Sequence, residues 1–308
     1  MINFRYHIVS LMAVFLALSI GMVLGVTFGA PVNAGINTQA EADRKQVQDL
    51  RAELDRRNQL DDYRDAWAAR AGRSLTDGVL TDYRVGLIAM PDAPTAVVNS
   101  ITTAVTDARG TLTSTTRVSR NAFDPAKVDD LNAAVEPYSG QLGLVAGMSN
   151  GTRFGLALGR ALGAKDVTDS DPLADSIRKS LTSRSLVDIN DEGVGQAQLL
   201  IVVTGRATDP RPLAEALSAH VDADVALRGY VLGVVLAGPN SDNIEGTDVL
   251  AARNQSTAVE VLSTVDVADL PSGVSTVVLA GKEQILGRQG HYGAFTKADS
   301  PLPVVPVR

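Results

Sequence analysis

The chain has 308 residues, of which 45% are hydrophobic and 20% charged, and its formal net charge at pH 7 is −7. An acidic chain lacks the positive surface by which proteins bind nucleic acids through counterion release, so we expect no nucleic-acid partner. It contains no cysteine, which excludes disulfide bonds, thiolate catalysis, iron–sulfur clusters and cysteine zinc sites.

The first element is an uncharged apolar stretch at residues 8–28, IVSLMAVFLALSIGMVLGVTF. A helix of this length covers about 30 Å, the thickness of a bilayer's hydrocarbon core, and it bonds all its own backbone groups. The alternative, a cleaved signal peptide, has a shorter apolar core of about 7–15 residues. We therefore predict a retained transmembrane helix.

Charges on either side of this helix predict its orientation. Residues 1–7 carry Arg5 and no acid, and the other side meets no charge until Glu41. By the positive-inside rule, residues 1–7 are a cytoplasmic flank and the bulk of the chain is extracytoplasmic. The predicted location is the cytoplasmic membrane, with a single crossing and the N-terminus inside.

Three glycines in and after this stretch recur every four residues: Gly21, Gly25 and Gly29. This spacing places them on one helix face, where they would let another helix approach closely. Because the same spacing also occurs by chance in apolar helices, a packing role for this face stays an open expectation.

Residues 38–72 predict a helical stalk, because the segment has no proline, no glycine before Gly72 and many good helix formers. Thr38 and Glu41 have the spacing of a capping box at its start, and Gly72 is expected to end it.

The stalk carries an interrupted apolar stripe. Its first part has the a/d spacing of a heptad, that register fails at Arg57 and Asp61, and the stripe then resumes. We predict a short coiled-coil segment with a break, in which the stalk pairs with another helix of the same or another chain. The alternative is a single helix that packs on its own domain or stands in solvent. The expected partner-binding residues are Val47, Leu50, Leu54, Leu60 and Trp67, with Tyr63 beside them.

Residues 82–308 predict an extracytoplasmic domain of the α/β class with a doubly wound, mainly parallel sheet of five or six strands. Short apolar runs without polar alternation suit strands that are covered on both faces, and they alternate here with helical periodicity. The expected strands are residues 85–90, 111–118, 199–204, 230–236 and 275–280, and the expected helices are residues 93–108, one capped by Asp124, and one opened by Pro210.

Glycine occupies every fourth position from residue 143 to residue 163. A second membrane span is disfavoured because Arg153 and Arg160 lie within the segment. We expect a closely packed soluble helix that starts near Thr152.

The candidate catalytic and metal-binding patterns in the sequence each have a structural interpretation. The turn after the first strand, Met90–Pro94, lacks the glycines of a dinucleotide site. His220 is expected near a helix C-terminus, where a cation is favourable. An acidic run is expected to form a loop that caps a helix at Asp171-Pro172 rather than a calcium site, because it lacks EF-hand spacing; it comprises Asp166, Asp169, Asp171 and Asp175.

These patterns predict no enzyme activity, no cofactor and no metal site. Copper(I) prefers thiolate, thioether and imidazole ligands. The chain offers no cysteine, five methionines and three histidines, so a copper path built by one copy is poorly supported.

Two stretches, Arg5–Gly25 (RYHIVSLMAVFLALSIGMVLG) and Val277–Gly293 (VVLAGKEQILGRQGHYG), resemble the actinobacterial MctB family of copper transport outer membrane proteins. Within that family the chain is most similar to the corynebacterial SteB type. The resemblance implies either copper transport and homeostasis at the envelope, or a membrane complex with a SteA-like partner on the cytosolic side. That complex would regulate a septal peptidoglycan hydrolase, and thereby cell separation.

The C-terminal signature comprises Gly287, Gly290, His291, Tyr292 and Gly293. One interpretation is a tight glycine turn with Tyr292 packed beneath it. The other is a partner or ligand surface near His291. The following segment, residues 301–306, is rich in proline and predicts extended chain.

Together these expectations describe a non-enzymatic, single-pass envelope protein. Its stalk and transmembrane glycines assemble an oligomer or complex, and its α/β domain recognises a partner. The favoured process is control of septal peptidoglycan hydrolysis, and the alternative is copper transport.

Overall fold

A computed structural model describes residues 4–167, 169, 171–207 and 214–304, without the side chains of residues 4, 5 and 28–41. The chain divides into two compact units, Met1–Arg64 and Asp65–Arg308. The expected helix start at Pro210 lies outside the described residues.

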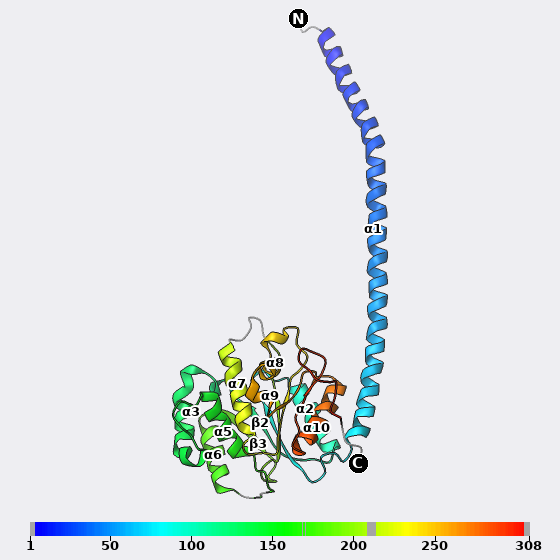
Figure 1. The fold of residues 1–308 in the computed structure, drawn as a ribbon. Helices are drawn as coiled ribbons and strands as arrows, with labels where there is room; N and C mark the ends of the chain where they lie inside the picture. The colour runs from blue at the N-terminus through cyan, green and yellow to red at the C-terminus, as the bar shows by residue number, and fades with distance from the viewer. Residues whose placement is uncertain (1–3, 168, 170, 208–213, 305–308) are drawn as a thin grey trace. The chain divides into compact units, whose positions relative to one another are not determined.

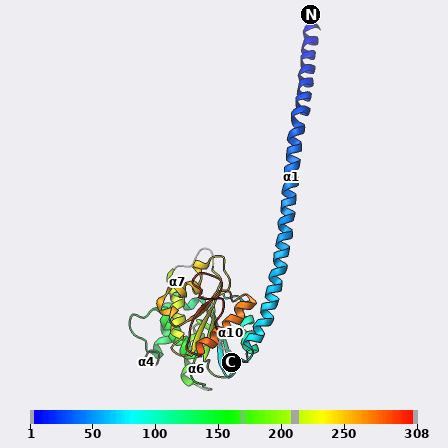
Figure 2. The ribbon, with the colours of Figure 1, turned by 45° about the vertical axis from the view of Figure 1, so that its right-hand side comes forward.

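The first unit consists of helix α1 (Phe4–Thr76), whose last turns belong to the second unit. The transmembrane segment and the stalk were expected as two helices, but the backbone is helical without a break between them (Figures 1 and 2). The expected cap at Thr38 is therefore wrong.

Gly72 does not end α1, which continues to Thr76. A Cβ at this position would overlap the Ser275 hydroxyl and come within 3.0 Å of the Ser275 Cβ. The glycine therefore permits close packing of α1 on a helix of the domain rather than termination.

The second unit is a doubly wound α/β fold with one seven-stranded sheet, ordered β3-β2-β1-β4-β5-β6-β7. Neighbouring strands are parallel except β2 and β3, which are antiparallel. The strands are β1 (Arg84–Ala89), β2 (Thr111–Val118), β3 (Val187–Asp191), β4 (Leu199–Val203), β5 (Gly233–Ala237), β6 (Ser263–Val265) and β7 (His291–Tyr292).

Helices cover both faces of this sheet (Figure 1). One face is covered by α2 (Thr95–Asp107) and α10 (Pro271–Ile285), and the other by the remaining longer helices. Those are α3 (Val128–Val135), α5 (Asn150–Leu162), α6 (Pro172–Ser183), α7 (Ala214–Leu227) and α8 (Asp248–Asn254); α4 (Ser139–Leu142) and α9 (Ser256–Val259) are single turns, and four 3-10 turns complete the fold at Arg120–Ala122, Pro125–Lys127, Glu136–Tyr138 and Ile244–Gly246.

Two hydrophobic clusters, one on each face of the sheet, explain the apolar strands. Within β4, Leu199, Ile201 and Val203 pack toward α2 and α10, whereas Leu200 and Val202 pack toward the other helices. A strand covered on both faces needs apolar residues at every position. The predicted α/β class and mainly parallel sheet are thereby confirmed.

The expected last strand at residues 275–280 is wrong, because this segment lies within α10. Residues Thr276 to Ala280 are all buried, so this run has no alternation of polar and apolar residues from which a helical period could be read. A short, fully buried apolar run does not distinguish helix from strand. Strands β3, β6 and β7 were not predicted.

The regular glycines of α5 are explained by its contact with α7. A Cβ on Gly151 would overlap the carbonyl oxygen of Ala219, and one on Gly155 would lie 2.7 Å from the Cα of Ala223. Only glycine lets the two backbones lie this close. The predicted closely packed helix is confirmed as Asn150–Leu162, with Ser149 as its N-cap.

Candidate functional site

Among the described residues, one helical segment, Tyr6–Thr27, is long and apolar enough to cross a membrane. Its side chains are exposed throughout. A Cβ on Gly21 or Gly25 would meet no atom within 4 Å, so this face is open to a close helix neighbour. The surroundings of Gly29 lie outside the described residues.

Beyond the membrane segment, α1 carries a row of exposed large hydrophobic side chains. Their exposed fractions run from 45% to 67%, although side chains of this kind are usually buried in soluble proteins. The row contains every expected partner-binding residue of the stalk: Val47, Leu50, Leu54, Leu60, Tyr63 and Trp67. We call this set the α1 row.

Two ion pairs lie along the helix beside the α1 row. Arg57 lies 2.6 Å from Glu53, and Arg64 lies 2.6 Å from Asp61. Exposed pairs three or four residues apart support a helix by only about 0.2–0.5 kcal/mol each. They therefore add slightly to the stability of the helix, but they do not bury its apolar side chains.

Within the second unit, the last turns of α1 border an apolar groove of about 290 Å³ on α10. Trp67, Ala71 and Leu75 line one side, and Leu279 and Leu302 line the other. Nearby, both nitrogens of the Arg109 fork donate to Asp77, at 3.0 and 3.2 Å. This ion pair links the end of α1 to the loop after α2.

The C-terminal signature packs into the sheet. His291 and Tyr292 form β7 beside β6, and both are buried. Gly287 and Gly293 have φ angles of +78° and +135°, which side chains rarely adopt, and a Cβ on Gly290 would overlap the Tyr292 hydroxyl. This geometry favours the structural interpretation of the signature over a surface at His291.

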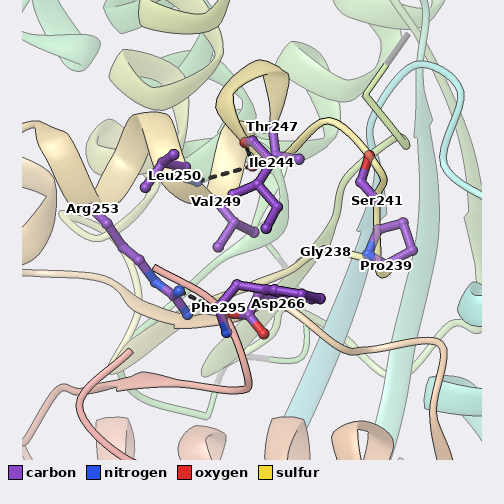
Figure 3. A pocket seen from close by; sticks show the side chains of 10 residues that line it. All are labelled: Gly238, Pro239, Ser241, Ile244, Thr247, Val249, Leu250, Arg253, Asp266 and Phe295. Carbon is purple, nitrogen blue, oxygen red and sulfur yellow. Dashed lines mark hydrogen bonds and ion pairs between the residues drawn. The ribbon is translucent and has the colours of Figure 1, made fainter. Parts of the chain in front are cut away.

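A buried arginine holds this signature in place (Figure 3). Arg253 of α8 donates to the Asp266 carboxylate at 2.6 Å, to the Thr264 hydroxyl at 2.8 Å and to the carbonyl oxygens of Tyr292 and Thr296 at 2.8 and 3.0 Å. Asp266 in turn accepts from the backbone of residues 294 and 295. We call Arg253 and Asp266 the C-terminal clamp.

The clamp leaves no room for a ligand. The cavity beside it, lined by Arg253, Asp266 and Phe295, has a volume of about 10 Å³. A cavity of that size holds at most about one water molecule. The clamp is therefore a structural device, and sequence reasoning missed it because neither residue lies in a recognisable motif.

His291 also faces the clamp. Its Nδ1 lies 3.0 Å from the Thr264 hydroxyl. Burial lowers the pKa of His291 below its usual value, and the positive charge of Arg253 adds to this effect, although Asp299 opposes it. The Tyr292 hydroxyl donates to the Glu283 carboxylate, and burial together with that carboxylate raises its pKa.

The carboxyl edge of the parallel strands is where doubly wound folds bind ligands, at the point where strand order reverses. Here β1 and β4 flank that point. A Cβ on Gly205, after β4, would lie 2.8 Å from the carbonyl oxygen of Pro91, after β1, so the backbones that follow the two strands approach closely at these positions. Arg120 also pairs with Asp92 at 2.6 Å.

His220 was expected near the C-terminus of its helix, but it lies in the middle of α7. Its Nδ1 lies 2.9 Å from the Asp248 carboxylate, and its ring packs edge-on against Phe123. Asp224, one turn further along α7, is 1% exposed, and its Oδ2 has no hydrogen-bond partner. Burial, together with the charge of Asp248, raises the pKa of Asp224 well above its usual value.

The acidic run near residue 170 is structural, as predicted. Asp171 caps α6 by accepting from the backbone of Leu173 and Ala174, and it pairs with Arg160 at 2.6 Å. These hydrogen bonds lower its pKa. Asp169 pairs with Arg84. In the described ranges, no group of three or more His, Asp or Glu side chains is arranged to hold a metal ion.

Comparison with known proteins identifies relatives along the whole chain. The family model described as "Copper transport outer membrane protein, MctB" matches residues 1–303. "Copper transporter MctB" of Mycobacterium tuberculosis (strain ATCC 25618 / H37Rv) is 29% identical over 318 residues, covering 95% of this chain and 96% of the relative. The protein of the same name from Mycobacterium leprae (strain TN) is 27% identical over 336 residues, covering 97% and 98%.

Proposed function

The chain belongs to the MctB family of copper transport outer membrane proteins, and from this premise we propose that it is a single-pass envelope protein that assembles with other chains through α1 to act in copper transport. The observation that carries the proposal is the α1 row, a line of large apolar side chains exposed beyond the membrane-spanning segment. Such a surface is stable in water once another helix covers it.

Copper is the substrate in this proposal, and several chains supply its ligands. The soft ligands of the described chain lie in different elements: His7, Met12 and Met22 are exposed on α1, Met90 is buried after β1, and Met148 precedes α5. His220 pairs with Asp248, and His291 is buried near Thr264. Met22 follows Gly21 on α1, so α1 helices that pair near the membrane glycines bring the Met22 thioethers of different copies to one depth in the membrane, where they can bind copper(I).

The α/β domain acts as a recognition module without enzyme activity. Between β1 and β4 the backbones approach closely at Pro91 and Gly205, and the buried pair of Arg253 and Asp266 ties α8 to the end of β6. In this proposal the N-terminus faces the cytoplasm, since Arg5 precedes the membrane segment and the next charge follows only at Glu41.

The α1 row also favours a second candidate process. A membrane-tethered domain on a helix with an uncovered apolar surface has the layout of a protein that holds another protein. Regulation of septal peptidoglycan hydrolysis, through a SteA-like partner and a hydrolase or its regulator, would use this layout without any metal ligand.

A deletion strain of the host separates the two processes. Copper sensitivity with normal septation supports the proposal, whereas chained cells with normal copper tolerance favour the second process and overturn the first. A strain with neither defect would contradict both.

Complementation of that strain tests the role of the α1 row. A chain with Val47→Ser, Leu50→Ser and Leu54→Ser should fail to restore copper tolerance. The matched control changes two exposed residues elsewhere on the helix, Ala52→Ser and Gln59→Ser, and should restore it. Full rescue by the triple variant would remove the first part of the row from the mechanism.

A further inference from the structure

The membrane glycines and the first part of the α1 row lie on the same side of one helix. Helix α1 is continuous from Phe4 to Thr76 (Figures 1 and 2), so positions far apart in it keep a fixed angular relation. At about 100° per residue, Gly21, Gly25, Val47, Leu50 and Leu54 all fall within an arc of about 80°. We call this arc the common face.

The second part of the α1 row points elsewhere. By the same rotation, Leu60, Tyr63 and Trp67 cluster about 140° away from Val47, Leu50 and Leu54. One straight neighbouring helix therefore covers only one of the two parts. The break in the heptad pattern separates two different surfaces.

Charged residues bound the apolar part of the common face outside the membrane. By the same rotation Asp43 lies on this face one turn before Val47, and Arg57 and Asp61 follow Leu54. Arg57 and Asp61, the next positions in strict register, are held in ion pairs with Glu53 and Arg64. The apolar part outside the membrane is thus only two turns long, and an isolated helix pair of this length is unstable in water. A partner that also contacts the glycine face in the membrane adds the missing contact. It also raises the effective concentration of the two stalk segments for each other.

A second copy of the chain meets these conditions, although pairing in register places Asp43 opposite Asp43 in the water-exposed part of the seam. Every copy is tethered by the same segment, Tyr6–Thr27, so two copies that cross the membrane in the same direction present their glycines at one depth. Their Val47, Leu50 and Leu54 then lie at one height above the membrane. A different protein would need the same spacing and the same phase between its two surfaces.

We propose that the common face binds the common face of a second copy, so that two α1 helices pair in parallel and in register. This inference rests on the proposed function, since it names the partner that covers the first part of the α1 row. It leaves Leu60, Tyr63 and Trp67 outside the seam, where they remain available for a different contact.

The lack of cysteine makes the seam directly testable by thiol cross-linking. Single-cysteine chains Leu18→Cys and Leu54→Cys place the thiol on the common face, one within the membrane and one beyond it. The matched controls Leu16→Cys and Leu60→Cys start from the same residue type but point about 160° and 120° away from Leu18 and Leu54, respectively. All four leucines are exposed, with 65%, 68%, 56% and 48% of Leu16, Leu18, Leu54 and Leu60 accessible, so none of the changes removes a buried contact.

The full-length chains are oxidised with diamide in native membranes and separated without reducing agent. Disulfide formation needs Cα atoms about 4.4–6.8 Å apart, which a parallel seam provides for facing positions. We expect at least about tenfold more covalent dimer from Leu18→Cys and Leu54→Cys than from their controls. Equal dimer in all four chains, or in the controls alone, would overturn the common face as the seam.

The outcomes also separate this inference from the proposed function. If no chain forms a covalent dimer while the triple serine variant still fails to restore copper tolerance, the second copy is wrong and another protein covers the common face. If dimers form as expected and the triple variant restores copper tolerance, pairing is real but the proposed role of assembly in copper transport fails.

Discussion

The contact between α5 and α7 gives a sharp test of the packing argument. Replacing Gly155 by alanine would gain about 1 kcal/mol from helix propensity alone. However, the new Cβ would lie 2.7 Å from the Cα of Ala223, where carbon atoms normally stay about 3.5–4.0 Å apart. The helices must then separate by roughly 1 Å, and overpacking of this kind costs about 1–3 kcal/mol or more.

The same change in an open helix serves as the control. Gly140 lies in α4, and a Cβ there would meet no atom within 4 Å. We expect Gly155→Ala to lower the melting temperature by about 2–4 °C for each kcal/mol lost, and Gly140→Ala to leave it unchanged or raise it. The assay is thermal unfolding of the detergent-solubilised chain followed by circular dichroism. A Gly155→Ala protein as stable as the parent would refute close backbone contact as the reason for this glycine.

Three further predictions concern buried charges. Arg253→Met leaves the Asp266 carboxylate buried without its cation, which should lower the free energy of urea unfolding by about 3–5 kcal/mol. The control Arg288→Met removes a half-exposed pair and should leave this free energy almost unchanged. Equal losses of stability in the two variants would contradict the clamp. Burial lowers the folded-state pKa of His291, so below about pH 6.5 the unfolded chain binds more protons than the folded chain. The free energy of unfolding should therefore decrease as the pH is lowered from 7 to 5. His291→Gln should flatten this dependence, and an unchanged slope would assign it to other groups. For Asp224, burial raises the folded-state pKa, so its stabilising contribution is complete below about pH 3.9 and is lost as the pH rises. Asp224→Asn should therefore raise the melting temperature at pH 7.5 but not at pH 4. Equal shifts of the melting temperature at both pH values would refute the assignment.

Most of the parallel sheet was predictable from short apolar runs, because a strand covered on both faces has apolar residues at every position. The strand at residues 199–204 matches β4 for this reason. The run at residues 275–280 has the same composition but is the buried middle of α10. Composition could not separate the two, since the choice depends on which neighbours surround the run. Strand β7, with two residues, is too short to leave any pattern.

The exposed residues of α1 were predictable because their spacing is a local property of one helix. The C-terminal clamp was not, since Arg253 and Asp266 become neighbours only when α8 and β6 are in place. His220 shows the same limit. Its pairing with Asp248 depends on the contact between α7 and α8, which no local pattern encodes.

The order of the elements along the chain sets the order in which they can form during biosynthesis. The sheet is completed only when His291 and Tyr292 join β6, and these residues follow every other strand in the chain. Helix α1 needs no distant segment to form and leaves the ribosome before any strand of the domain. If α1 is inserted and pairs as proposed, a nascent chain is anchored before its domain can close, so newly made copies have time to meet through their helices while the rest of each polypeptide is still unfolded.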